Sequence, residues 1–484
     1  MSLSLKIAYS LGHFSNDLCA SVWFTYTIVF FTHGMCFTDF SVGVLMLVGQ
    51  ISDAFATPAV GIMSDKLSSD SSVNEMREGI FRKIIYKLKK IWPKKRKGIH
   101  LFGTILVLIS FPLLFTSFKF ENSTISLLFY IFLAIIFQIG WASVQISHLA
   151  LLNDISSDTH IRANLVSGRY IAYIVANSLV FSLFFFLFKF LRPNELFKFP
   201  YLHNVHSQYS DTDFSPEDVQ TFSVLVYIVT GVGILTSAGF HFGLKNDHID
   251  YTHMEEENES LLVDPHFKGK NIKQKSFDWF RDSKFWFLGL FYMTIRLIVN
   301  VSQLYINMYL LVSLKLSNSS ISLVPLTIYI SSILSTLLQN QIQRFVPRNI
   351  NCLIGSILIS IFSMVILFLD FNSNEKIPII YIAAVILGVG SSILLVSGIS
   401  MISDLVGKEN KKTGAFVFGA MSFVDKLSCG IVIQIIQILK PILTEKIRNG
   451  CEIFFKDLES YGIAGFTIAC VIFLIFYSLR DIKN

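Results

Sequence analysis

Long apolar runs, separated by shorter polar segments, fill most of the chain. Each run holds about 20 residues or more, the length that an α-helix needs to cross the hydrocarbon core of a bilayer. Six runs fall near residues 5–33, 40–63, 99–118, 125–152, 163–190 and 219–244, and six more near 284–313, 321–343, 351–370, 377–402, 414–439 and 461–479. The pattern predicts an all-α membrane protein with twelve transmembrane helices. We expect a six-helix half at 1–244, a polar linker at 245–283 and a second six-helix half at 284–484.

Composition supports this prediction and excludes several classes of protein. Hydrophobic residues make up 52% of the 484 residues and charged residues 15%, whereas about 25% are charged in an ordinary soluble domain. Little material remains for a soluble catalytic domain, so we do not expect an enzyme. The six cysteines show no C-x-x-C spacing, and we expect neither a metal site nor a cofactor.

The distribution of positive charge predicts the orientation of the helices. The net charge of +6 comes mainly from one loop, which contains Lys87, Lys89, Lys90, Lys94, Lys95, Arg96 and Lys97. Short loops rich in Lys and Arg stay in the cytosol, so both termini and the linker should be cytosolic. The sequons at Asn122 and Asn318 then face the other side, where glycosylation occurs. The basic loop fits anionic membrane lipid better than nucleic acid, because no aromatic platform accompanies it.

Polar side chains within the apolar runs are candidates for a substrate or coupling site, because ionisable groups in a membrane are costly and usually functional. They are Asn16, Asp17, Gln50, Asp53, Gln145, His148, Arg169, Arg296, Asn300, Gln303, Asp425 and Lys426. The alternative is that they form internal ion pairs and hydrogen bonds that only orient the helices. His148 fits either a proton-handling group or a packed, hydrogen-bonded histidine.

For two sets of these residues, the spacing along the chain predicts how the side chains are placed around a helix. Arg296, Asn300 and Gln303 are spaced i, i+4, i+7 and share one helical face, which cannot look at lipid. Asp425 and Lys426 are adjacent, about 100° apart around a helix, so each needs a partner on another span. Asp17 and Asp53 are the candidate carboxylates.

Two loop motifs suggest a conformational latch and a sorting signal. Gly61 allows a close helix approach, and Asp65 can pair with a cytosolic base or cap a helix end, so the segment could hold one conformation. In the linker, Glu257 is followed after three residues by Leu261 and Leu262. An exposed acidic residue and Leu pair can bind a sorting adaptor as an extended peptide.

The segment around the second run resembles a known family. Ser52-Asp53-Ala54, followed by Pro58-x-x-Gly61-x-x-x-Asp65, is similar to the glycoside–pentoside–hexuronide cation symporter branch of the major facilitator superfamily. This resemblance implies two six-helix halves that rock around a midplane site. It also implies that the site is lined by the residues that match the branch's pattern, Asp17, Asp53, Arg169 and Lys426.

The chain departs from that branch where the branch binds its cation. Ala56-Thr57 stands where an Asn-Asp pair is usual, and Gln145 stands at the position of an acid on span four. Two oxygen donors for a hard cation are therefore missing. The departures favour the proton over sodium as the coupling ion and leave simple facilitation open.

Longer blocks in both halves resemble a family of lysosomal and melanosomal cysteine importers. The blocks are GHFSNDLCASVWFTY (residues 12–26), IIFQIGWASVQISHL (135–149), YMTIRLIVNVSQ (292–303) and TGAFVFGAMSFVDK (413–426). The resemblance implies transport of a small zwitterion, with Asp17 or Asp53 facing its ammonium and Arg296 or Lys426 its carboxylate. A plasma-membrane symporter for a sugar or another organic solute is the alternative, and a transporter-like receptor without flux is a third possibility.

Overall fold

The computed structural model describes residues 3–68, 95–118, 120–155, 159–190, 218–244, 276–316, 318–342, 345–369, 376–406, 411–444 and 450–482. Every regular element in these ranges is a helix. The first part contains α1 (Leu3–Leu11), α2 (Phe14–Val29), η1 (Phe30–Gly34), α3 (Asp39–Ser68), α6 (Lys95–Leu114), α7 (Ser123–Ile155), α8 (Thr159–Phe190) and α9 (Val219–Gly243). The second contains η4 (Ser276–Arg281), α11 (Ser283–Met308), η5 (Tyr309–Ser313), α12 (Asn318–Ile342), α13 (Arg348–Phe368), α14 (Lys376–Val406), α15 (Lys411–Thr444), α16 (Gly450–Asp457), η6 (Leu458–Gly462) and α17 (Ile463–Ile482).

These elements confirm the prediction of twelve membrane-crossing helices. Eleven helical segments in the described ranges are long and apolar enough to span a bilayer. The remaining span consists of α1, α2 and η1, whose pieces of 9, 16 and 5 residues follow one another from Leu3 to Gly34. The last span begins at Gly450, earlier than the apolar pattern indicated, because the polar residues of α16 and η6 still continue the helix.

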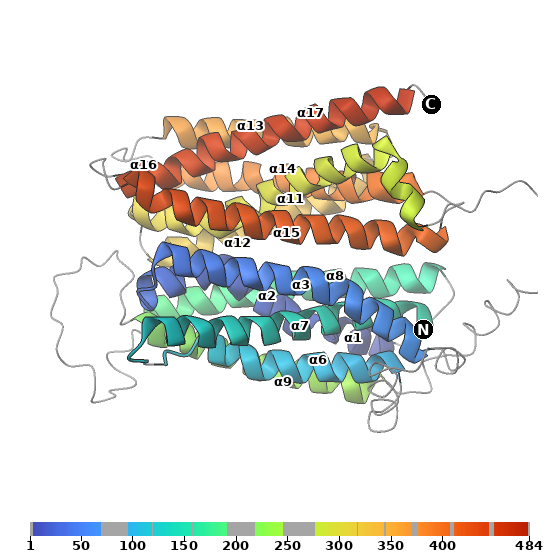
Figure 1. The fold of residues 1–484 in the computed structure, drawn as a ribbon, viewed down its shortest axis with the longest axis horizontal. Coiled ribbons are helices and arrows are strands. Elements are labelled where there is room, and N and C mark those ends of the chain that lie inside the picture. The colour runs from blue at the N-terminus through green and yellow to red at the C-terminus, as the bar shows by residue number, and fades with distance from the viewer. Residues whose placement is uncertain are drawn as a thin grey trace, which may run out of the picture.

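The helices form two groups that lie side by side (Figure 1). One group contains α1–α9 and the other contains α11–α17. Among the described residues, three pairs of helices make the main contacts across the boundary: α3 with α15, α8 with α12, and α2 with α11. Both chain ends lie at the same end of the bundle, which we call the terminal end (Figure 1). Residues 245–275 of the predicted linker lie outside the described residues, and the expected domain boundaries stay a prediction.

The first helix of each group ends in the same way. A π-helical turn closes each one, at Phe30–Gly34 and at Tyr309–Ser313. Each turn is followed by a residue with positive φ, Cys36 at 54° and Lys315 at 53°. Two unusual endings at equivalent places indicate an internal structural repeat, as in transporters built from duplicated halves.

Candidate functional site

A buried ion pair joins α15 to α3 near the middle of both helices. The ammonium nitrogen Nζ of Lys426 lies 2.6 Å from Oδ1 of Asp53, and the side chains are 14% and 10% exposed. Lys426 also donates a 2.7 Å hydrogen bond to Oγ1 of Thr57, which donates to the Asp53 carboxylate at 3.0 Å. The expectation that Lys426 finds its partner on another span is confirmed, and the partner belongs to the other group of helices.

Asp425, the neighbour of Lys426, faces α11 within its own group. Its Oδ2 accepts a 2.8 Å hydrogen bond from Nε of Arg296, and Nδ2 of Asn300 lies 3.5 Å from its other oxygen. Arg296 and Asn300 therefore share a face, as their spacing predicted. The adjacent residues Asp425 and Lys426 thus hold two separate ion pairs, one inside a half and one between halves.

Gln303, the third residue on this face of α11, contacts a cluster of aromatic side chains. Its side-chain amide nitrogen, Nε2, donates a hydrogen bond to the hydroxyl of Tyr329 in α12. The ring of Tyr329 in turn contacts that of Tyr173 in α8, with the centroids 6.4 Å apart. Gln303 therefore connects α11 to the contact between α8 and α12 instead of joining the Asp425 ion pair.

A cavity of about 270 Å³ lies where α8 faces α11, α12 and α14. Hydroxyl and amide groups line part of it, including those of Tyr173, Gln303, Tyr329, Ser332, Ser391 and Ser392. None of its described lining residues is Asp, Glu, Lys or Arg. The charged candidates and this cavity are therefore separate features, and a charged ligand in the cavity would have to draw on the nearby ion pairs.

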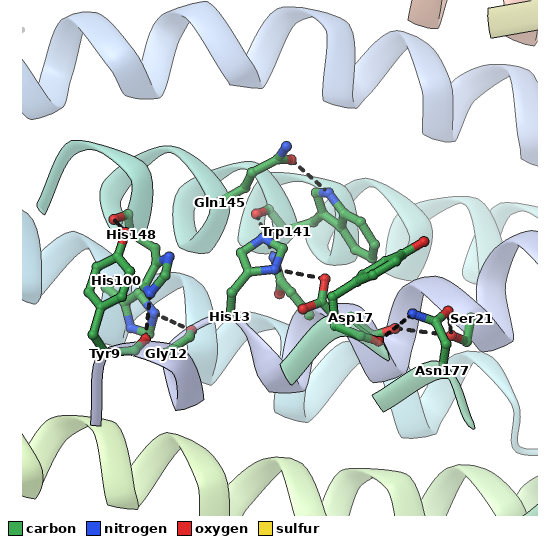
Figure 2. A network of polar contacts seen from close by, with 12 residues as sticks. Tyr9, Gly12, His13, Asp17, Ser21, His100, Trp141, Gln145, His148 and Asn177 are labelled. Atoms are coloured by element: carbon green, nitrogen blue, oxygen red, sulfur yellow. Dashed lines mark hydrogen bonds and ion pairs between the residues drawn. The ribbon is translucent and has the colours of Figure 1, made fainter. Parts of the chain in front are cut away.

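A second polar group lies inside the N-terminal half (Figure 2). Nδ1 of His13 lies 2.8 Å from Oδ1 of Asp17, and the two side chains are 5% and 8% exposed. Asn16 donates to the main-chain oxygen of Trp141 in α7 at 3.1 Å, and the Trp141 indole donates to Oε1 of Gln145 at 3.1 Å. Asp17 therefore pairs with His13, and not with Arg296 or Lys426 as the sequence had allowed.

His13 lies where the first span is interrupted, between Leu11 and Phe14. Two histidines from other helices bind the carbonyl groups at this break (Figure 2). Nε2 of His148 in α7 lies 2.8 Å from the Tyr9 oxygen, and Nε2 of His100 in α6 lies 2.7 Å from the Gly12 oxygen. A carbonyl oxygen only accepts, so both imidazoles donate through Nε2. The structure thus shows His148 as a packed, hydrogen-bonded side chain.

Comparison with known families decides what this bundle is. Residues 8–442 match the model of a family described as "MFS/sugar transport protein". This chain belongs to the major facilitator superfamily. It is a multi-pass membrane transporter by family and fold.

Curated relatives of this transporter cover nearly its whole length. Major facilitator superfamily domain-containing protein 12 from Mus musculus is 33% identical, over 98% of this chain and 93% of the relative. The protein of the same name from Homo sapiens is 33% identical, over 94% of this chain and 89% of the relative. The resemblance to the major facilitator superfamily noted in the sequence is therefore confirmed.

Solved structures share the fold of this transporter at low sequence identity. The nucleoside transporter NupG aligns with a TM-score of 0.62 and 11% identity, over 98% of each chain. The D-xylose-proton symporter aligns with a TM-score of 0.65 and 13% identity, over 98% of this chain and 96% of the other. Such likeness supports the major facilitator fold and says nothing about substrate.

The remaining candidates of the transporter lie apart from one another. Gln50 is buried against α15, where a Cβ on Gly430 would meet its Cβ at 3.0 Å. Arg169 in α8 is half-buried and lies close enough to His13, Asp17 and His148 to act on them electrostatically. At Gly61 an added Cβ would find only an ordinary contact at 3.9 Å with Ile146, so the close helix approach expected there is absent. The side chain of Asp65 lies outside the described residues.

The surface motifs of the transporter are only partly described. Asn122 is exposed at the start of α7, and its side chain accepts a 2.8 Å hydrogen bond from the Thr124 amide. Asn318 begins α12, and its side chain is outside the described residues. Glu257, Leu261 and Leu262 also lie outside them. The glycosylation, latch and sorting roles all stay predictions.

Sequence reasoning missed two residues of the transporter's N-terminal network, His13 and His100. His13 stands four residues before Asp17, the spacing that brings two side chains together on a helix. That spacing was a usable signal. For His100 the sequence offered no comparable sign, because its partner is a main-chain oxygen in another helix.

Proposed function

We propose that this transporter imports cysteine from the cytosol into lysosomes or lysosome-related organelles by alternating access. The observation that carries the proposal is the arrangement of Asp425 and Lys426. The two neighbours hold opposite charges in two separate ion pairs, with the half-buried Arg296 and with the nearly buried Asp53. A free amino acid brings an ammonium and a carboxylate of its own, which can replace one partner in each pair.

Binding energy would come from new ion pairs between the charges of the substrate and those of the protein. In a dry site each buried charge requires a counter-charge. We assign the carboxylate of the substrate to Lys426 or Arg296 and the ammonium to Asp53 or Asp425. Binding there would loosen the Lys426–Asp53 contact between α15 and α3, and so link substrate to movement of the two halves.

A direct test measures radiolabelled cysteine flux into proteoliposomes that contain purified protein. Arg296→Ala and Lys426→Ala should each lower the flux at least tenfold. The matched control is Lys315→Ala, which removes a cation whose side chain is 61% exposed and paired with Glu452; its flux should stay within about twofold, as expected for a surface pair.

A double substitution separates binding from structure. If the Lys426–Asp53 pair only holds helices together, Asp53→Ala/Lys426→Ala removes both charges and should recover flux lost in the single variant. If Lys426 binds substrate, the double variant should remain inactive. Recovery to near wild-type flux would overturn the assignment.

The second candidate function is symport of a sugar or another organic solute at the plasma membrane. The lining of the cavity between α8, α11, α12 and α14 favours it, because Tyr170, Tyr173 and Tyr329 offer aromatic faces and hydroxyl groups. Sugar flux without cysteine flux in the same proteoliposomes would select this alternative. The sequence departures at Ala56-Thr57 and Gln145 support the proton over sodium as coupling ion in either case.

A further inference from the structure

A buried contact inside the N-terminal half brings together two groups that can exchange a proton. His13 and Asp17 lie one turn apart at the start of α2, with Nδ1 and Oδ1 2.8 Å apart. Both residues are almost completely buried, at 4% and 5% exposure. The pair is neutral with one added proton, whichever of the two groups carries it, and negative without that proton. One proton thus sets the charge of a site that water barely reaches.

Atoms without partners mark this pair as more than a structural contact. Among the described residues, Nε2 of His13, Oδ2 of Asp17 and Nδ1 of the neighbouring His148 have no hydrogen-bond partner. Buried polar groups in folded proteins are usually hydrogen-bonded. Three unfilled positions in one small region leave room for protons to bind and rearrange.

Charged and titratable groups lie around the pair on neighbouring helices, among them Tyr173 of α8 and Tyr329 of α12, on which Asp17 acts electrostatically. The ring of His148 in α7 lies 5.8 Å from that of His13, and His100 in α6 lies 6.1 Å from His148. Arg169 in α8 acts electrostatically on both members of the pair. From α9, Nε2 of His241 lies 3.1 Å from Nδ1 of His100, and Lys97 of α6 acts on His241.

These groups extend from the buried pair toward the terminal end of the bundle. His241 lies near the end of α9 and is half-buried, whereas His100, His148 and His13 are buried. The line is not a continuous chain of proton donors, because the Gly12 carbonyl stands between His100 and His13. Its role is to hold the broken helix and to provide polar surroundings at the pair.

We propose that His13 and Asp17 form a proton-binding site that takes up and releases one proton in each transport cycle. In the step, a proton from solution bonds to the free nitrogen of His13 or to the Asp17 carboxylate, and the same bond breaks when the proton leaves on the other side. His100 and His148 are positioning residues, because they bind the main-chain carbonyls of Gly12 and Tyr9, which lie just before His13 in the chain. This site rests on the proposed transport function for its role in a cycle, but proton binding itself does not.

Proton binding is tested without any substrate. Infrared difference spectra of the purified, full-length protein between acidic and alkaline buffer should contain carboxyl or imidazole bands that vanish in both His13→Gln and Asp17→Asn. The matched control is His33→Gln, the same change at the other end of the same span, which should retain them. Spectra that are identical in the wild type and all three variants would overturn the site.

Coupling is tested in proteoliposomes loaded with a pH-sensitive dye. During cysteine flux the wild type and His33→Gln should move protons, whereas His13→Gln and Asp17→Asn should lose proton movement at least tenfold. Size-exclusion chromatography of the purified protein should give both variants the same single peak as the wild type, which shows that they fold. Equal proton movement in His13→Gln and the wild type would refute coupling through this pair. Absence of cysteine flux in the wild type would refute the proposed substrate and leave the infrared result standing.

Discussion

Glu459 places a carboxyl group in the interior of the C-terminal half. It lies in the π-helical turn η6 with 0% of its surface exposed, and among the described residues neither oxygen has a hydrogen-bond partner. An unsatisfied buried polar group costs about 1–3 kcal/mol, and more if it is charged. We therefore expect Glu459→Met, which fills similar space without polar oxygens, to raise the apparent melting temperature of the detergent-solubilised protein.

A nearby glutamate supplies the control for this prediction. Glu452, in α16 of the same span, pairs with Lys315 at 2.7 Å, and the Lys315 side chain is 61% exposed. Such a pair contributes about 1 kcal/mol or less, so Glu452→Met should leave the melting temperature unchanged or slightly lower. A clear drop for Glu459→Met would contradict the prediction, because it would show that the carboxyl group has a stabilising partner.

The interrupted first span shows how one element depends on side chains from others. At the break, the Tyr9 carbonyl has two partners, the Gly12 amide at 3.0 Å and His148. The Gly12 carbonyl accepts its hydrogen bond from His100. We expect His100→Phe to lower the melting temperature more than His148→Phe. The first variant leaves the Gly12 carbonyl without its hydrogen bond, whereas in the second the Tyr9 carbonyl keeps the Gly12 amide as a partner. The free energy of unfolding should fall by an amount on the order of 1–3 kcal/mol in each variant.

Variants that retain a donor check the cause of this effect. His100→Gln and His148→Gln can still donate to a carbonyl, so each should be more stable than the matching Phe variant. The measurement is the melting temperature of each variant in the same detergent. Equal losses for Phe and Gln at His100 would mean that packing, and not the hydrogen bond, holds the break.

The whole molecule is closed at the end opposite the termini by contacts between its halves. Nζ of Lys440 in α15 lies 2.6 Å from Oδ1 of Asp39 at the start of α3. Nearby, Asn307 of α11 donates to the Thr25 oxygen of α2 at 2.8 Å. Glycine also allows close packing along this contact, since a Cβ on Gly43 would meet Gln437 Cβ at 2.9 Å. Alternating access requires these contacts to separate in each cycle.

Cross-linking tests that requirement. With the exposed cysteines Cys36 and Cys451 replaced by Ala, a reducible bifunctional thiol reagent applied to Asp39→Cys/Lys440→Cys should stop flux, and reduction should restore it. The control is Lys315→Cys/Glu452→Cys, a pair within the C-terminal half, whose cross-linking should leave flux intact. Full flux in the cross-linked inter-half variant would show that this end does not need to open.

The linker sequence predicts the subcellular location of the whole protein. If Glu257, Leu261 and Leu262 bind a sorting adaptor, Leu261→Ala/Leu262→Ala should move the transporter from the organelle to the plasma membrane. Val263→Ala, a loss of apolar surface at the next residue, should leave the location unchanged. Fluorescence microscopy and surface labelling make the comparison. Organelle location of the Leu261→Ala/Leu262→Ala variant would remove the signal.

The sequence by itself determined the class of protein, the number of spans and the buried positions of charge. These properties follow from contiguous residues, because about 20 apolar residues in a row form a helix that prefers the bilayer. Spacing along one helix also predicted that Arg296 and Asn300 share a face, since i, i+4 geometry is local. The same spacing could have predicted that His13 lies beside Asp17.

Only the tertiary structure decided which charges meet. Lys426 pairs with Asp53, Arg296 with Asp425 and Asp17 with His13, whereas the sequence left several assignments open for each cation. Pairing between spans depends on the rotation and depth of each helix, which packing against neighbouring helices sets. The break at Gly12 needed the structure for the same reason: its freed carbonyls are stabilised by His100 and His148, which local sequence does not bring near it.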